Sequence, residues 1–231
     1  MAWQALLDNV IWHSLSGSQA HLSVGTAEAR RYARGYSPIA AFADAARPDY
    51  AALEAFCEPG EALYCSGPAI PAPAGWQVNA ETTLAKMVWA APMPAVDPRF
   101  EPVRLGPEHV PQMMNLVALT KPGPFGPRTL EMGEYFGAFE GERLIAMAGE
   151  RMYAAPLREV SGVCTHPDFQ GRGLARRLMN GLIRREMQRG EIPFLHVMCS
   201  NAGALALYRN MGFEVRMEMP VRVMAHGPAS T

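Results

Sequence analysis

Two glycines one residue apart, Gly171 and Gly173, lie in the stretch GVCTHPDFQGRGLA (162–175), between an apolar run and a long amphipathic segment. Glycine lacks the side chain that keeps a ligand away from the backbone. If the segment that follows is a helix, its first N–H groups are unpaired and the helix dipole adds partial positive charge there. The stretch therefore predicts an anion site suited to phosphate, with Arg172 inside the turn as a candidate contact.

The residues around these glycines narrow the kind of phosphate ligand. A phosphate loop requires GxxxxGK followed by serine or threonine, and no lysine or hydroxyl residue directly follows Gly173. A Rossmann fingerprint requires three spaced glycines in the first strand–helix unit, whereas this turn comes late in the chain and follows a predicted hairpin. Neither a nucleotide-hydrolysing loop nor a dinucleotide site is therefore expected.

The turn and a later block together resemble the GNAT superfamily of acyl-CoA-dependent N-acetyltransferases. Residues 170–175 (QGRGLA) match its Q/R-x-x-G-x-G/A pattern, and NAGALALYRNMGFE (201–214) is similar to its second signature, N-x-x-A-x-x-L-Y-x-x-x-G-F. The two blocks are independent and occur in the order of the family, and the resemblance covers roughly residues 99–226. It implies the GNAT fold, acetyl-CoA as co-substrate without a metal, and direct attack of a primary amine on the thioester in a ternary complex.

The same resemblance implies roles for individual residues. It places the pantetheine arm of CoA along Val163, Cys164 and Thr165, with the amide of Val163 or a neighbour polarising the thioester carbonyl. It implies that Tyr208 protonates the departing thiolate, and that Asn201 contacts CoA while capping its helix. The residues expected to hold the pyrophosphate are Gln170, Gly171, Arg172, Gly173, Leu174 and Ala175.

Transfer to an amine also needs a base, because a primary amine with a pKa of about 10 is mostly protonated at neutral pH. Glu159 is the candidate, since it precedes Gln170 by eleven positions, the separation of the glutamate base in histone-type members of the superfamily. Residues 159, 161, 163 and 165 share one face of a regular strand, so Glu159 is expected to face the cleft. The alternative is a structural carboxylate paired with Arg158 or Arg151.

Two further side chains compete for a catalytic role. His196, in FLHVMCS, lies in the next predicted strand and is a second candidate base, although a lone histidine in a core strand is more often structural. Cys164 as a covalent nucleophile is a weaker alternative. It is expected on the strand face opposite Glu159, and the sequence offers it no evident histidine partner.

These side chains need a sheet and a helix to hold them. LREVSGVCT (157–165) and FLHVMCS (194–200) are predicted strands, and residues 171–189 form a helix ended by Gly190. A strand–helix–strand unit implies parallel pairing with a right-handed crossover. Upstream, GEYFGAFEGERLIAMAGERMYA (133–154) predicts a hairpin with its turn at 140–142. The expected fold class is α/β (α+β), with a mixed central sheet flanked by helices and, by the resemblance, splayed between the two parallel strands.

A proline-rich stretch, APMPAVDPRF (91–100), has the composition of a linker, since proline continues neither a helix nor a central strand. We place a domain boundary there, with a smaller mixed α/β domain at residues 1–97 and the acetyltransferase domain at 98–231. The first half includes a helix predicted for RPDYAALEAFC (47–57) but carries neither signature. It resembles the degenerate N-terminal half of tandem relatives such as glycine-N-acyltransferase-like proteins.

The composition argues against several partners. With 21 Lys and Arg against 22 Asp and Glu, the chain has no basic surplus for nucleic acid. No apolar run approaches membrane-spanning length, and the four cysteines have neither zinc-site nor disulfide spacing. Only Lys86 and Lys121 are lysines, and with the abundant Ala, Gly and Pro this indicates a GC-rich bacterial genome. A cytoplasmic bacterial protein is therefore expected.

The sequence thus predicts an N-acetyltransferase that uses acetyl-CoA. Two other classes stay open, a non-catalytic acyl-CoA sensor and a nucleotide-binding regulator. The acceptor is a small-molecule amine or a peptide or protein amine, and the sequence decides neither its identity nor whether the protein is a monomer or a homodimer. The Gly- and Pro-containing segment 120–136, with Phe125 and Tyr135, is expected to shape the acceptor pocket.

Overall fold

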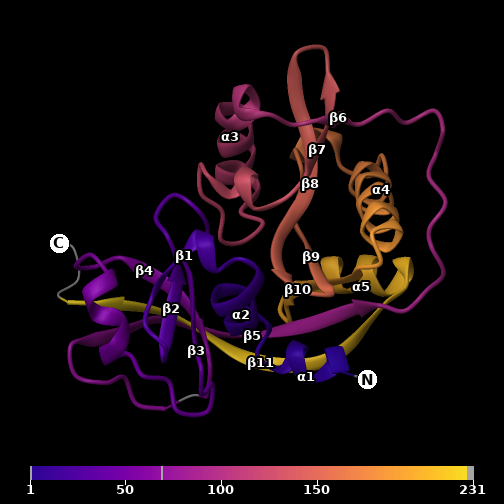
Figure 1. The fold of residues 1–231 in the computed structure, drawn as a ribbon. Coiled ribbons are helices and arrows are strands. Elements are labelled where there is room, and N and C mark those ends of the chain that lie inside the picture. Colours follow the sequence, from indigo (N-terminus) through magenta and orange to yellow (C-terminus); the bar gives the residue numbers. More distant parts are fainter. Residues whose placement is uncertain (1, 69, 228–231) are drawn as a thin grey trace.

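Eleven strands form one mixed sheet in the computed structural model, which describes residues 2–68 and 70–227 (Figure 1). The strand order is β1-β2-β3-β4-β11-β5-β10-β9-β8-β7-β6. The strands are β1 (Ser23–Gly25), β2 (Ala29–Tyr32), β3 (Ile39–Phe42), β4 (Ala62–Ser66), β5 (Trp76–Trp89), β6 (Val103–Arg104), β7 (Tyr135–Glu140), β8 (Arg143–Ala154), β9 (Leu157–Thr165), β10 (Ile192–Met198) and β11 (Phe213–His226). The helices are α1 (Ala2–Asp8), α2 (Val10–His13), α3 (Val110–Thr120), α4 (Leu174–Gln188) and α5 (Ala202–Met211). Shorter helical turns are η1 (Ser14–Ser18), η2 (Ala20–Leu22), η3 (Ala51–Phe56), η4 (Pro107–His109), η5 (Thr129–Met132) and η6 (Pro167–Phe169).

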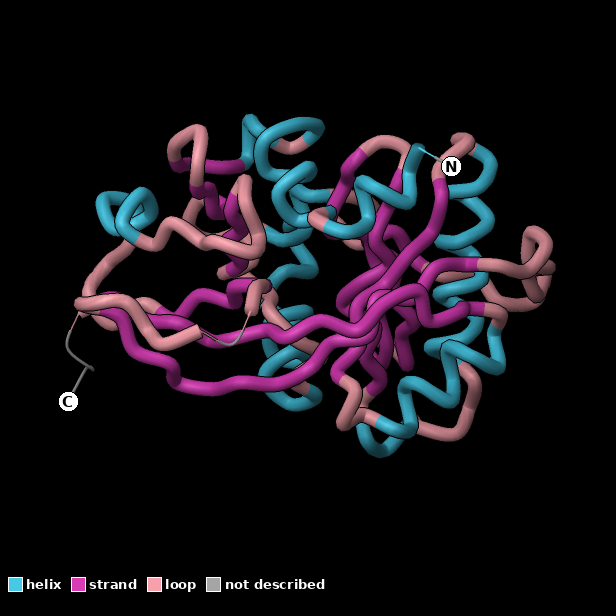
Figure 2. Tube along the Cα trace, turned by 90° about the horizontal axis from the view of Figure 1, so that it is seen from below, coloured by secondary structure: helices cyan, strands magenta, loops and turns pink. Residues whose placement is uncertain are grey.

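Two strands of 14 residues each, β5 and β11, tie the halves of the chain together. They pair antiparallel along their length, β5 also pairs with β10 of the second half, and β11 also pairs with β4 of the first half. Figure 2 shows these two strands running from one half of the molecule to the other. The predicted linker lies between β5 and β6. The sheet is continuous across it, and the division into domains at residue 98 stays a prediction.

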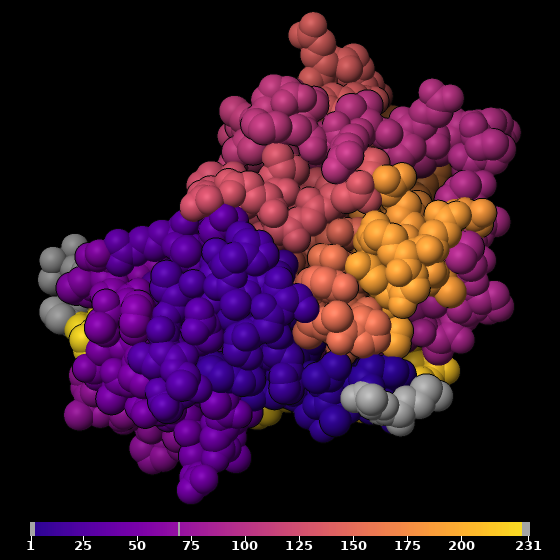
Figure 3. All heavy atoms as spheres, viewed as in Figure 1, coloured from indigo at the N-terminus to yellow at the C-terminus, as the bar shows by residue number. Residues whose placement is uncertain are grey.

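The two faces of the central sheet pack against different layers. Because successive strand residues point to opposite faces, neighbours such as Met87 and Val88 enter different cores. The core under α4 includes Met87, Val160, Leu178, Leu182 and Leu195. The core on the other face, under α1 and α2, includes Leu7, Ile11, Val88, Leu157 and Phe194. Helices α1 and α2 of the first half therefore cover one face of the shared sheet, and Figure 3 shows the atoms of the first half packed directly against those of the second half.

The predicted strand–helix–strand unit is confirmed, since β9 and β10 are parallel and α4 connects them. The helix begins at Leu174 and not at residue 171, because Gly171 and Gly173 hold positive φ angles of 76° and 71°. Its buried stripe follows the helical period, as the sequence predicts. The hairpin of β7 and β8 is also confirmed, with its turn at Gly141.

The helix predicted for residues 47–57 is wrong in type. The structure has the 3₁₀ helix η3 there, only six residues long. Short helical segments gain little from α-type hydrogen bonds, so a tighter 3₁₀ turn is common in connections of this length.

One ionisable group on α4 is buried without a partner. The Glu186 side chain is 0% exposed, and neither of its carboxyl oxygens has a hydrogen-bond partner among the described residues. Burial, and then the nearby Glu150, raises the pKa of Glu186 well above the ordinary 4.5. The folded state thus holds a proton that the unfolded chain releases above pH 4.5. Its contribution to stability is full below that pH and falls as the pH rises toward the folded-state pKa.

We expect Glu186→Met to raise the free energy of unfolding by about 1–3 kcal/mol at pH 8, because it removes a buried, unpaired polar group and keeps a good helix former. The gain shrinks toward pH 4.5, where the unfolded chain also keeps the proton. Urea unfolding at pH 4.5, 6 and 8 measures both effects. Gln188→Met, exposed on the same helix, serves as the control. A variant no more stable than wild type at pH 8 contradicts the prediction.

Candidate active site

β9 and β10 part a few residues after they meet. Their pairing is recorded only from Ile192↔Leu157 to Phe194↔Glu159, although β9 continues to Thr165 and β10 to Met198. The expected splay of the sheet is therefore confirmed. It opens a cleft of about 400 Å³, lined by both strands, by the turn before α4 and by α5.

A β-bulge at Gly162 reverses the order of side chains along β9. Between Ser161 and Cys164, β9 takes three steps where β8 takes two, and Gly162 has a φ angle of 61°. Beyond the bulge Val163 packs on the core under α4, while Cys164 joins the core under α3. The extra residue shifts the alternation by one. The predictions that Glu159 shares a face with Val163 and lies opposite Cys164 are therefore wrong.

The glycine turn leads directly into α4. Gly173 is the N-cap, and within the described ranges no side chain caps this helix end. A Cβ atom at Gly171 would meet no atom within 4 Å, and Gln170 lines the cleft. The first N–H groups of α4 are therefore accessible to an anion. Arg172 lies beside them but pairs with Glu140 at 3.3 Å, so its phosphate contact stays a prediction.

α5 brings the second sequence block to the cleft, which Asn201 and Tyr208 both line. The Oδ1 of Asn201 accepts a hydrogen bond of 3.1 Å from the N–H of Ala204, so the predicted cap is confirmed. Burial raises the pKa of Tyr208 to about 12. Its hydroxyl therefore keeps its proton near neutral pH and is able to donate it. The contacts of both residues with CoA stay predictions.

Glu159 is held by hydrogen bonds from two side chains and from the backbone N–H of Met152 (3.3 Å), and it does not line the cleft among the described residues. Its carboxylate accepts hydrogen bonds from Arg151 Nε (2.9 Å) and Nη2 (2.8 Å) and from His196 Nδ1 (2.7 Å), and its side chain is 1% exposed. Burial alone would raise the pKa of Glu159, but Arg151 and His196 outweigh it and hold that pKa well below its ordinary value. The pairing with Arg151 matches the structural alternative, and direct action of Glu159 as the base stays a prediction.

Arg151 and Glu159 belong to a row of four ionisable side chains on four neighbouring strands. Lys86 on β5 and His196 on β10 are register partners, followed by Glu159 on β9 and Arg151 on β8. The Lys86 Nζ donates to the carbonyl oxygens of the last two residues of α1, at 2.7 and 3.0 Å. Burial lowers the pKa of Lys86 to about 8. One end of the row is therefore held by the first half of the chain.

In this row, His196 has a ring nitrogen that makes no hydrogen bond to the described residues. Its Nε2 is buried and has no hydrogen-bond partner within the part of the chain that the structure describes, and the residue lines the cleft. Burial lowers the pKa of His196 below 6.5, against the opposing effect of Glu159. A carboxylate only accepts, so Nδ1 carries the proton of the neutral ring and Nε2 has a lone pair. The ring is thus able to take up a proton at neutral pH.

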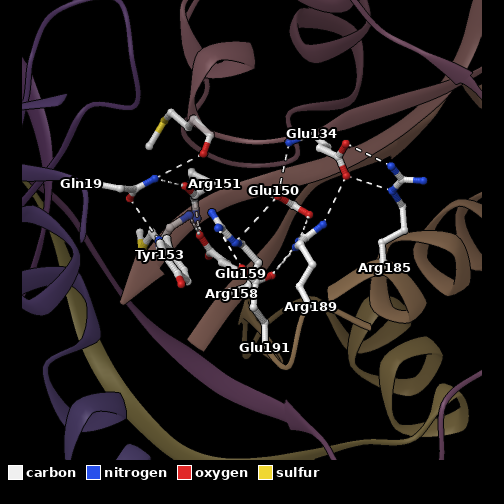
Figure 4. A network of polar contacts seen from close by, with 12 residues as sticks. Gln19, Glu134, Glu150, Arg151, Tyr153, Arg158, Glu159, Arg185, Arg189 and Glu191 are labelled. Atoms are coloured by element: carbon white, nitrogen blue, oxygen red, sulfur yellow. Dashed lines mark hydrogen bonds and ion pairs between the residues drawn. The ribbon is translucent and has the colours of Figure 1, made fainter. Parts of the chain in front are cut away.

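Figure 4 shows Arg151 and Glu159 of this row together with further ion pairs beside them. Arg185 pairs with Glu134 at 2.9 Å, and Arg189 pairs with Glu150 at 2.6 Å. These contacts join the C-terminal end of α4 and Arg189, which directly follows it, to the residue before β7 and to β8. The two arginines are therefore engaged in ion pairs that hold the fold, away from the cleft.

Cys164 lines the cleft but is a poor nucleophile. It is 6% exposed, and burial raises the pKa of its thiol to about 12. The reactive thiolate is then scarce at neutral pH.

The sequence analysis missed a group of cleft residues from the first half. These four apolar or aromatic side chains have no motif of their own, and three of them lie on short elements, so no local signal marks them. With Met152 and Val221 of the second half, the apolar lining of this end is Ile11, Ile39, Tyr64, Leu84, Met152 and Val221.

The described ranges, 2–68 and 70–227, contain neither a candidate metal site nor a candidate membrane-spanning helix. No group of three or more His, Cys, Asp or Glu side chains is placed there to hold a metal ion. No helix in these ranges has the length and apolar character needed to cross a membrane.

The family model described as FR47-like protein matches residues 135–223. Over 83 residues the chain is 40% identical to the N-alpha-acetyltransferase RimI of Mycobacterium tuberculosis, a match covering 35% of this chain and 51% of that protein. Over 90 residues it is 38% identical to a ribosomal protein bS18-alanine N-acetyltransferase of Salmonella typhimurium, covering 34% of this chain and 60% of that protein. The chain thus spans between half and two thirds of the length of these curated relatives.

A solved structure resembles the whole chain. It comes from Novosphingobium aromaticivorans, is described as an acetyltransferase from the GNAT family, and is 37% identical with a TM-score of 0.88. The match covers 96% of this chain and 99% of that one, so it includes the first half. Descent of the first half from a degenerate repeat stays a prediction.

We expect Arg151→Met to lower the free energy of unfolding by about 3–5 kcal/mol near pH 7, because it leaves the Glu159 carboxylate buried without its guanidinium. The pKa of Glu159 is depressed in the wild type, so this stabilisation is full above about pH 4.5 and is lost as the pH falls through the lower folded-state value. Urea unfolding from pH 3 to pH 7 measures the loss. The control is Arg47→Met, which breaks the exposed pair with Asp44. Equal effects of the two substitutions would contradict a stabilising role of the buried pair.

Proposed function

The chain belongs to the GNAT family of N-acetyltransferases, and from this premise we propose that it transfers an acetyl group from acetyl-CoA to a primary amine by direct attack in a ternary complex. The observation that supports this most strongly is the cleft between β9 and β10. A bulged strand, an uncapped helix start and a buried tyrosine border the same cavity. The strand suits the pantetheine arm and the thioester, the helix start suits the pyrophosphate, and the tyrosine suits protonation of the thiolate.

The donor side is built from backbone. Residues Gln170 to Ala175 hold the pyrophosphate through the first N–H groups of α4. Val163, Cys164 and Thr165, where β9 has lost β10 as a partner, pair with the pantetheine arm as an added strand would. The bulge takes one residue out of the ladder, so an N–H near Val163 polarises the thioester carbonyl. Such a pre-aligned donor is worth on the order of 3 kcal/mol in the transition state.

Acid and base lie on opposite sides of the sheet. Tyr208 packs with the core under α4, whereas His196 belongs to the row that faces the first half. We propose that His196 Nε2 takes the proton from the attacking amine, and that Glu159 is a positioning residue that holds the ring through Nδ1, as the third member of a triad does. As the nitrogen bonds to the carbonyl carbon and the C–S bond breaks, the Tyr208 hydroxyl protonates the thiolate.

The raised pKa of Cys164 supports direct transfer without an acyl-enzyme. One curated relative is named an N-alpha-acetyltransferase and the other for an alanine of ribosomal protein bS18, and both come from bacteria, which supports an amine acceptor and a bacterial protein here. A cytoplasmic location stays a prediction. A sensor that binds acyl-CoA without turnover is the alternative that the following experiments separate from this proposal.

We expect Tyr208→Phe to lower kcat by about 100-fold with little change in the KM for acetyl-CoA, because it removes the proton donor and keeps the packing. The loss is smaller with an acetyl thioester whose thiol has a lower pKa, since that leaving group needs less protonation. Release of free thiol measures both rates. Tyr153→Phe, which removes a hydroxyl from a tyrosine that does not line the cleft, is the matched control. Equal losses with both thioesters would remove Tyr208 from the acid role.

We expect His196→Gln to lower kcat/KM by about 100-fold at pH 7. The variant approaches the wild-type rate as the pH rises past the pKa of the amine, because the amine is then already neutral. In the wild type the base fails only below pH 6.5, since the folded-state pKa of His196 lies below that value. A pH–rate profile of both proteins measures this. Wild-type activity of His196→Gln at pH 7, with loss in Glu159→Gln, would instead identify Glu159 as the base.

A further inference from the structure

The acceptor end of the cleft is an apolar chamber formed mainly by the first half of the chain. Its walls come from α2, β3, β4, β5, β8 and β11, elements that the fold brings together from both ends of the sequence. Leu84 and Tyr64 are partly exposed there, and the other wall residues are at most 5% exposed. We define the acceptor chamber as Ile11, Ile39, Tyr64, Leu84, Met152 and Val221.

The position of the chamber indicates that it binds the acceptor amine and not CoA. Leu84 lies two residues before Lys86 on β5, so both side chains point to the face that the first half covers. His196 is the register partner of Lys86 and faces the same side. The proposed base therefore borders the chamber, whereas the glycine turn and Tyr208 approach from the side of α4 and α5. A substituent on the attacking amine has to lie in the chamber.

The charges around the chamber select against ionic substituents. Among the described residues that line the cleft, none is an aspartate or a glutamate. Of the basic ones, Arg151 is paired with Glu159, Lys121 is exposed, and His196 is the proposed base. A second cation on the acceptor would lose its hydration without gaining a counter-ion, which is costly in an apolar site. An uncharged apolar group has no such hydration free energy to lose when it enters the chamber.

The loop that closes the chamber is fixed in place. The Pro124 carbonyl accepts hydrogen bonds from Ser37 Oγ (3.0 Å) and Arg151 Nη1 (3.1 Å), and the Arg128 N–H donates to the Gly35 carbonyl (2.7 Å). A Cβ at Gly126 would lie 2.1 Å from the carbonyl oxygen of Tyr36, so only glycine fits against this segment. A wall anchored in this way resists expansion, and the cavity of about 400 Å³ also has to admit the thioester. The chamber therefore suits a compact group.

We propose that the acceptor chamber selects a primary amine that carries a compact, uncharged, apolar substituent next to the reacting nitrogen. This inference rests on the proposed acetyl transfer. It names the substrate class of that same site, and it makes Leu84 a specificity-determining residue.

The test compares α-amino acid amides, which share the reacting amine and differ only in the side chain. The probes are leucinamide, serinamide, argininamide, aspartic acid α-amide and glycinamide, with acetyl-CoA at pH 8 and release of CoA thiol as the readout. We expect kcat/KM for leucinamide to exceed that for serinamide, argininamide and aspartic acid α-amide by at least about tenfold, the order of discrimination that apolar pockets achieve.

Variants at Leu84 test the chamber itself. Leu84→Ala lowers kcat/KM for leucinamide by about tenfold and leaves glycinamide within about twofold, because only the larger group contacts residue 84. Leu84→Glu shifts the preference toward argininamide. Leu119→Glu, at an exposed position of α3 outside the cleft, is the matched control and keeps the wild-type order. If Leu84→Glu does not fold, as judged by thermal unfolding, Leu84→Ala carries the test.

Two failures are distinguishable. If the wild type acetylates argininamide or a polyamine as well as leucinamide, or if Leu84→Ala leaves the preference unchanged, the apolar chamber is refuted while acetyl transfer stands. If acetyl-CoA stabilises the protein against heat but no amine releases CoA, acetyl transfer itself fails and the sensor alternative replaces it.

Discussion

The Glu159 carboxylate, held between a guanidinium and an imidazole, is the interaction on which the site depends. Glu159 lies at the last recorded register pair of β9 with β10, where the two strands begin to part. Arg151 reaches it from β8 and His196 from β10, so three strands are joined at the apex of the cleft. A buried charge without such partners would be protonated or exposed. The orientation of the His196 ring is therefore fixed at the point where β9 and β10 part.

The first half of the chain completes this arrangement from the other face of the sheet. The end of α1 receives the Lys86 ammonium, and Ser37 binds the loop that closes the cleft. β5 brings Lys86 beside His196 because it inserts between β11 and β10. A half that carries no signature thus supplies the surroundings of the proposed base and most walls of the proposed acceptor chamber. The relative from Novosphingobium also includes this half, since the match covers 96% of this chain.

The wrong prediction of which β9 side chains share a face has a single cause, the bulge at Gly162. Strict alternation along a strand assigns Glu159 and Val163 to the same face. Gly162 adopts a left-handed φ and adds one residue to β9, so every side chain beyond it changes face. The expectation that Glu159 faces the cleft fails for another reason, because its carboxylate is buried against Arg151 and His196, which line the cleft in its place. A glycine in a predicted strand is the signal that indicates such a bulge.

The sequence by itself determined the local chemistry of the donor side. The turn at Gly171 and Gly173, the amphipathic helix after it, the Asn201 cap and the position of Tyr208 each depend on residues close together in the chain, where periodicity and capping rules apply. Only the tertiary structure decided which groups meet. The row from Lys86 to Arg151 and the acceptor chamber combine residues up to 210 positions apart, from Ile11 to Val221. Their juxtaposition comes from strand order and from desolvation in a shared core, which no local pattern encodes.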